Sequence, residues 1–139
     1  MCMCVYIGSM NKLPIVEWND ATPGFSLAEI SGKNLPEVAA VSMKSNYYYE
    51  AYSFMGCACG FSYGEWSRKD KDEEHHLRVR DVEEFMRYLS DNFNDNSLKL
   101  FCTSWDIFPE EYEEKDFRII AIDENEFDFE ENVILKIEK

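Results

Sequence analysis

Residues 81–93 have the spacing of apolar residues that is typical of an amphipathic helix. This stretch stands alone among short extended segments, which limits the folds that the chain can adopt. Its apolar residues recur at intervals of three and four, which places them on one helical face: Val82, Phe85, Met86, Leu89 and Phe93. Asp81 precedes this face as the expected N-cap, and Glu84 follows three residues later. The pattern predicts one long helix that begins at Asp81 and buries this face against a sheet.

Short apolar or aromatic segments before and after this helix have the composition of β-strands. They cover residues 1–8, 25–30, 47–54, 98–105, 117–122 and 133–137, with residues 106–116 as an acidic loop. Strands and helices do not alternate regularly along the chain, which argues against a parallel sheet. The sequence therefore predicts an α+β fold: a mainly antiparallel sheet with one long amphipathic helix, and with residues 35–43 as the candidate for one short helix.

Length and composition favour a single globular domain over residues 1–139. Hydrophobic residues make up 45% of the chain and aromatic residues 15%, which is too much apolar mass for a disordered segment. A chain of this length buries enough surface to hold a core without further support. Residues 65–80 are instead dense in charge and lack periodicity, so we expect an exposed charged loop there.

The net charge of −14 limits the classes of partner, and the acidity is concentrated in the last quarter of the chain. Residues 106–139 contain 13 acidic and 4 basic residues, a net charge of −9. Such a field repels nucleic acid and anionic membranes, because binding either one requires Lys and Arg. It permits a basic protein partner, as in an acidic immunity or inhibitor-type protein, and the acidic stretch interleaves aromatic residues that suit such a role: Phe108, Tyr112, Phe127 and Phe129. A solubilising surface is the plainer interpretation.

The expected location is the cytoplasm. No stretch approaches the roughly 18–20 apolar residues that cross a bilayer. The first residues also lack the basic and apolar regions of an export signal. Thiols stay reduced in the cytoplasm, and the five cysteines are an odd number, so no disulfide framework is expected.

Two Cys-x-Cys units, Cys2/Cys4 and Cys57/Cys59, are the strongest candidate for a chemical site. If their segments pair as neighbouring strands, the four thiols converge and could bind zinc, whose thiolate ligands lie at about 2.3 Å. A flat strand separates alternate side chains by nearly 7 Å, so chelation requires a bend, which Gly56 and Gly60 permit. We favour the alternative in which reduced thiols pack around this turn without a metal. Zinc is the one cofactor that the sequence suggests.

A catalytic role for Cys2 is a remote alternative. Removal of Met1 would expose the α-amino group of Cys2, which could then act as the base for its own thiol. Met1-Cys2 resembles the opening of glutaminase-type N-terminal-nucleophile hydrolases, although Met3 stands where that family has glycine. The sequence has no accompanying oxyanion motif, so we lean against an enzyme and assign no catalytic residue.

The two histidines and Cys102 are expected to have a structural place in the chain, without a chemical role. His75 and His76 are adjacent and point in different directions on any regular element, so they do not form a helical pair of metal ligands. Cys102 shares a strand face with Leu98 and Leu100, which predicts a small core residue rather than a reactive thiol.

Three segments together resemble a family of small bacterial proteins of unknown function. They are residues 1–6 (MCMCVY), Pro23-Gly24-Phe25, and residues 47–61, which end in GCACGF. The resemblance covers about the first 65 residues well and the remainder loosely. It implies a bacterial, cytoplasmic setting and brings no activity, cofactor or catalytic residue.

Overall fold

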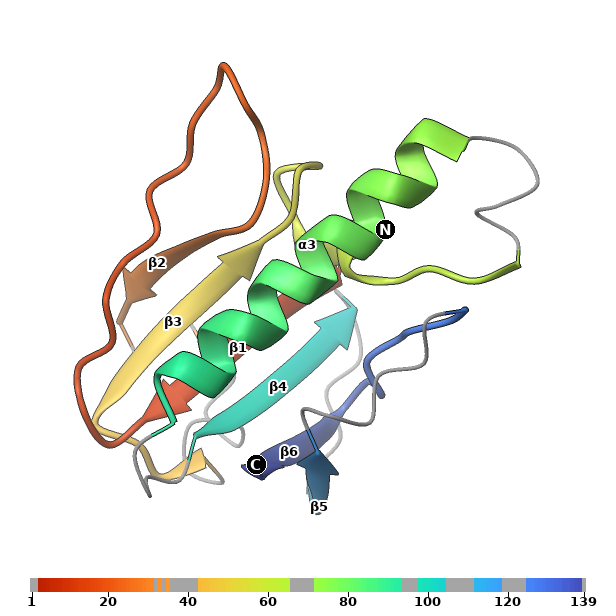
Figure 1. Cartoon of the computed structure of the whole chain (residues 1–139). Helices are drawn as coiled ribbons and strands as arrows, with labels where there is room; N and C mark the ends of the chain where they lie inside the picture. The colour runs from red at the N-terminus through yellow and green to blue at the C-terminus, as the bar shows by residue number, and fades with distance from the viewer. Residues whose placement is uncertain are drawn as a thin grey trace.

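Six strands form one sheet, and a long helix crosses one of its faces in the computed structural model of the chain (Figure 1). The structure describes residues 3–31, 33, 35, 43–65, 72–93, 98–104, 112–118 and 125–138. The elements in chain order are β1 (Met3–Ser9), β2 (Ser26–Ile30), β3 (Tyr47–Tyr52), the 3-10 helix η2 (Ala58–Phe61), α3 (Asp72–Asp91), β4 (Lys99–Ser104), β5 (Glu113–Arg118) and β6 (Val133–Glu138). The expected α+β class is confirmed.

The strand order is β2-β3-β1-β4-β6-β5, and every neighbouring pair is antiparallel except β5 with β6. The N-terminal strand β1 therefore lies in the interior of the sheet, where Val5 is opposite Ala51 of β3 and Cys102 of β4. Val5 and Ile7 are fully buried toward the helix, and Tyr6 is half-buried on the opposite face. An apolar pattern on both sides of a strand is typical of such a central position.

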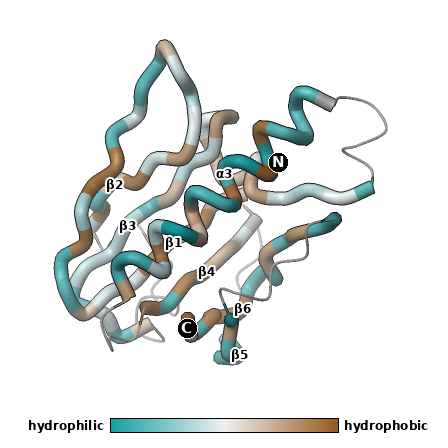
Figure 2. The backbone as a smooth tube through the Cα atoms, in the orientation of Figure 1, coloured by the Kyte–Doolittle hydropathy of each residue, from teal (hydrophilic) through white to brown (hydrophobic). Residues whose placement is uncertain are grey.

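The predicted apolar face of α3 packs on the sheet. Val82, Phe85 and Leu89 have no exposed surface. The centroid of the Phe85 ring lies 5.0–6.0 Å from the ring centroids of Phe25, Phe61 and Phe129. Met86 is also buried, and Phe93 packs against the same core just after the helix ends. Figure 2 shows hydrophobic and hydrophilic positions alternating along the helix, as an amphipathic element requires.

The start of the helix differs from the prediction. Residues 72–80 belong to α3 and are not part of an exposed loop, whereas residues 66–71 lie outside the described residues. Asp81 is consequently not an N-cap but a fully buried residue in the middle of the helix. The first half of α3 is held in part by hydrogen bonds of Arg78 and Arg80, and such contacts leave no apolar period in the sequence to reveal a helix.

The acidic stretch before β6 also differs from the prediction. Residues 113–116 form most of β5 rather than a loop, and of the strand expected at 117–122 only Phe117 and Arg118 lie within the described residues. Parallel pairing with β6, from Glu113 opposite Val133 to Arg118 opposite Glu138, supplies the backbone hydrogen bonds. A strand at the edge of a sheet can form through backbone pairing alone. The polar composition of β5 therefore gave no sign of a strand in the sequence.

A second, smaller apolar cluster covers the sheet face that points away from α3. Leu35, Met43, Phe101 and Ile134 are buried there. Apart from Leu35 and Met43, the candidate short helix at 35–43 lies outside the described residues. In the described part of the chain, no helix has the length and apolar character needed to cross a membrane.

Candidate functional site

The Cys57/Cys59 unit lies on a tight turn that Ser53 organises at the end of β3. The Ser53 hydroxyl donates a hydrogen bond to the Cys57 carbonyl at 2.6 Å and accepts one from the Gly60 amide at 3.0 Å. The Ser53 amide donates to the same Cys57 carbonyl at 2.9 Å. Gly56 adopts a positive φ of 77°, which glycine adopts without strain. The bend that the flanking glycines predict is therefore present.

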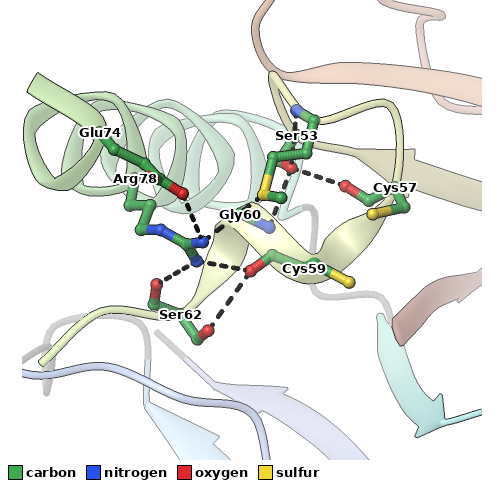
Figure 3. Close-up of polar contacts among 8 residues, drawn as sticks. Ser53, Cys57, Cys59, Gly60, Ser62, Glu74 and Arg78 are labelled. Carbon is green, nitrogen blue, oxygen red and sulfur yellow. Dashed lines mark hydrogen bonds and ion pairs between the residues drawn. The ribbon is translucent and has the colours of Figure 1, made fainter. Parts of the chain in front are cut away.

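Arg78 of α3 holds this turn against the helix (Figure 3). Its guanidinium donates hydrogen bonds to the carbonyls of Cys59 at 2.8 Å and Ser62 at 3.0 Å, and it pairs with Glu74 at 3.1 Å. The residue is only 6% exposed, so these acceptors replace the water that it has lost. The sequence signal for this contact was slight: an arginine four residues after a glutamate within a charged stretch.

Three described cysteines, Cys4, Cys59 and Cys102, lie in or beside the first residues of β1. The Cys59 thiol accepts a hydrogen bond from the Met3 amide at 3.2 Å, because the cysteine turn lies beside β1 beyond the end of β3. Cys4 lies on the face of β1 that points away from α3, since it alternates with Val5. Cys102 is completely buried on the helix side, as predicted, and burial above all raises the pKa of its thiol.

The cysteine turn contacts the N-terminal strand, but it does not pair with β1 as a neighbouring strand, because β3 and β4 are the two neighbours of β1. The zinc hypothesis stays a prediction. It requires Cys2 together with Cys4, Cys57 and Cys59, and Cys2 lies outside the described residues. The hydrolase alternative rests on the same residue and stays equally open. Within the part that the structure describes, no group of three or more His, Cys, Asp or Glu side chains is arranged to hold a metal ion.

A polar cluster on the sheet face opposite α3 was not anticipated. Tyr6 of β1 lies opposite Glu50 of β3, and the Tyr52 hydroxyl donates a hydrogen bond to Glu50 at 2.6 Å. Burial, and then the neighbouring Cys4, raises the pKa of Tyr6, while burial and the bond to Glu50 raise the pKa of Tyr52. Both phenols are protonated at neutral pH and can donate hydrogen bonds.

His75 and His76 belong to the first half of α3 rather than to a loop. His75 places its ring edge-on to Tyr63, with 5.6 Å between the ring centroids, and His76 is exposed. Neither histidine takes part in a metal-holding group among the described residues.

Exposed acidic side chains occur on β5 and on the segment that precedes β6. Glu113, Glu114 and Asp116 are exposed on β5, and four more exposed acids precede β6: Glu126, Asp128, Glu130 and Glu131. Two ion pairs stand within this group, Lys99 with Glu114 at 3.0 Å and Lys115 with Glu130 at 2.7 Å. Although the Asp128 side chain is exposed, loss of water around its carboxylate raises its pKa; a hydrogen bond from the Phe129 amide offsets part of this rise, and the nearby Glu131 adds to it.

Two aromatic residues of this region, Phe127 and Phe129, are buried rather than available as surface contacts. Phe127 and Phe129 alternate with the exposed acids and are 7% and 3% exposed, so they belong to the core. Tyr112 is half-buried with its ring edge-on to Phe101, and Phe108 lies outside the described residues. The expectation that these aromatics contact a partner is therefore wrong for Phe127 and Phe129.

Comparisons of the chain with protein-family models, with curated proteins and with solved structures found no match. The resemblance to a bacterial family stays a prediction on the residues quoted above.

Proposed function

We propose that the protein is a non-catalytic binding domain that takes up a basic segment of another protein along β5. The observation that carries this proposal is an edge strand that is exposed along almost its whole length and carries three acids, Glu113, Glu114 and Asp116, against two basic residues, Lys115 and Arg118. In the described part of the chain β5 pairs only with β6, so its other side offers backbone hydrogen-bonding groups. An extended peptide can add to such an edge as one more strand.

Charge complementarity selects the kind of segment. Glu114 and Asp116 lie on one face of β5 and Glu113 on the other, because alternate residues of a strand point in opposite directions. On one face, Lys or Arg side chains of an added strand would meet Asp116 and Glu114, which already pairs with Lys99, and on the other face they would meet Glu113 next to Lys115. The overall charge of −14 would speed the approach of a basic partner and disfavour an acidic one.

The non-catalytic part of the proposal is supported by how the cysteine turn is used. The backbone groups of Cys57 and Cys59 accept hydrogen bonds from Ser53 and Arg78, and the Cys59 thiol accepts one from Met3. These are contacts that fix a fold. Elemental analysis of protein purified without a metal-affinity step tests the zinc hypothesis for Cys2, Cys4, Cys57 and Cys59 separately.

The test uses a peptide of alternating lysine and threonine, measured by calorimetry at physiological salt. The variant Glu113→Gln/Glu114→Gln/Asp116→Asn should lose about tenfold or more in affinity. A matched control, Glu73→Gln/Glu83→Gln/Asp91→Asn, neutralises three exposed acids of α3 and changes the net charge equally. It should bind within about twofold of the unaltered protein.

Two outcomes would overturn the proposal. Equal weakening in both triple variants would indicate a diffuse electrostatic attraction without a site on β5. Undiminished binding of a peptide in which prolines replace the threonines would exclude strand addition, because proline cannot donate to the ladder.

A further inference from the structure

The connection between β1 and β2 projects beyond the sheet and the helix (Figure 1). It carries exposed apolar side chains. Trp18 is 41% exposed and Ile15 is 54% exposed. Tryptophan gains more from burial than most residues, so its exposure on a projecting loop calls for an explanation.

The loop is firmly attached at both of its sides. Val16 and Leu27 exchange two backbone hydrogen bonds of 3.2 and 2.8 Å. The Leu13 amide donates to the Tyr49 hydroxyl at 2.7 Å, and the Tyr88 hydroxyl of α3 donates to the Pro14 carbonyl at 2.5 Å. These bonds tie the loop to both the sheet and the helix, so the tip is held on a rigid base.

The tip itself fixes the orientation of the indole ring. The Trp18 Nε1–H group donates to Asp20 Oδ1 at 2.6 Å, which holds a carboxylate beside the ring. Asn19 closes the turn by accepting hydrogen bonds from the amides of Ala21 at 3.0 Å and Thr22 at 3.2 Å. An exposed aromatic ring and an exposed carboxylate are thereby arranged side by side before any partner arrives.

We propose that Trp18 and Asp20 form a binding site for the guanidinium group of an arginine side chain on a partner protein. A guanidinium is planar, so it can stack on the indole face while its N–H groups donate to the carboxylate. The net charge of −14 favours such a cation, and the fixed geometry reduces the entropy lost on binding. A lysine ammonium could pair with Asp20 but would stack less well.

This site is separate from the β5 edge and does not depend on it. The loop leads into β2, and β2 and β5 are the first and last strands in the order of the sheet. Failure of one proposal therefore leaves the other standing, and each has its own variants.

The experiment titrates a neutral glycine-flanked peptide with one central arginine and follows the Trp18 indole N–H resonance by NMR. Matched peptides carry citrulline, which keeps the shape without the charge, or lysine. The arginine peptide should shift the resonance saturably, the lysine peptide less, and the citrulline peptide not at all. Trp18→Leu and Asp20→Asn should each weaken binding by about two- to fivefold, as for an exposed cation–π contact. Because Trp18→Leu lacks the indole N–H, its binding is measured on other resonances of the loop.

Asp91→Asn, an exposed acid of α3, is the control for net charge and should leave the affinity unchanged. The β5 triple variant should also bind the arginine peptide within about twofold of the unaltered protein. Unaltered binding by Trp18→Leu, or equal losses in Asp20→Asn and Asp91→Asn, would overturn the proposal. Equal shifts with the citrulline peptide would do the same. Both loop residues are exposed, so circular dichroism should show that the variants fold normally.

Discussion

The carboxylate of Asp81, which has no exposed surface, accepts a hydrogen bond of 2.7 Å from the backbone amide of Phe54. Its other oxygen pairs with Arg80 at 2.9 Å, and Arg80 in turn donates to the Pro23 carbonyl at 2.9 Å. One buried charge in the middle of α3 thus joins the helix, the segment after β3 and the β1–β2 loop.

Replacing Asp81 with alanine should lower the free energy of unfolding by about 1–3 kcal/mol, because the partly buried Phe54 amide would lose its acceptor. Urea denaturation measures the change. Glu83→Ala, an exposed position on the same helix, should stay within about 0.5 kcal/mol of the unaltered protein. A comparably small effect at Asp81 would mean that this contact does not stabilise the fold.

Truncation of Phe85 to alanine should cost about 3–5 kcal/mol, because a fully buried ring leaves a cavity among Phe25, Phe61 and Phe129. Arg87→Ala, on the exposed side of α3, is the matched control for lost helix contacts. Chemical denaturation of the two variants measures the difference. A loss below about 1 kcal/mol for Phe85→Ala would contradict the assigned helix face.

Two glycines of the cysteine turn should respond differently to substitution. An added Cβ at Gly60 would clash with the Ser53 hydroxyl and lie 2.7 Å from its Cβ, so Gly60→Ala should cost about 1–3 kcal/mol through steric overlap. Gly56 faces open space but has a φ of 77°, so Gly56→Ala should cost about 1–2 kcal/mol through backbone strain alone. Thermal unfolding compares them.

Asparagine separates the two causes. It tolerates positive φ, so Gly56→Asn should recover part of the loss seen with alanine, whereas Gly60→Asn should be worse than Gly60→Ala. The same ranking of alanine and asparagine at both positions would refute this distinction.

Stability should fall in alkaline solution. Burial raises the pKa of Cys102, and Glu131 and Asp128 raise it further, so the folded protein retains this proton after the unfolded chain has lost it. The free energy of unfolding should therefore be unaffected by this group below about pH 8.5, the ordinary thiol value, and fall as the pH rises above it. Tyr6, Tyr52 and Tyr88, whose pKa values are also raised mainly by burial, add to the fall above about pH 10.

Cys102→Ala should show a smaller decline between about pH 8.5 and 10 than the unaltered protein, measured as urea-unfolding free energy at each pH. Thiol reagents should also leave Cys102 unmodified until the protein unfolds. An identical decline in the variant would assign the alkaline loss to other groups.

The sequence predicted the features that depend on local periodicity. The burial of Phe85 and Cys102 follows from spacing along one helix and one strand, and the bend at Cys57 follows from its flanking glycines. Arg78 and Asp81 escaped prediction because their acceptors and donors lie in a turn far away in the sequence. No local pattern distinguishes such a buried charge from a solvated one.

The sequence predicted which segments form the candidate site, but not the contacts between their side chains. The sequence suggested that the N-terminal strand meets the cysteine turn, and the Met3–Cys59 hydrogen bond shows this contact, although the turn is not a strand paired with β1. The Glu50–Tyr52 cluster and the rigid position of Trp18 depend on strand register and on loop anchors from distant elements. These follow only from the three-dimensional arrangement.

The interior position of β1 has a consequence for synthesis on the ribosome. Its neighbour β3 ends at Tyr52, but its other neighbour, β4, ends only at Ser104. A nascent chain can form the β2-β3-β1 half-sheet early, yet one side of β1 must wait unpaired until β4 has been translated. Such an open apolar strand is prone to pair wrongly with another chain, so conditions that slow translation between β3 and β4 should favour aggregation or capture by chaperones.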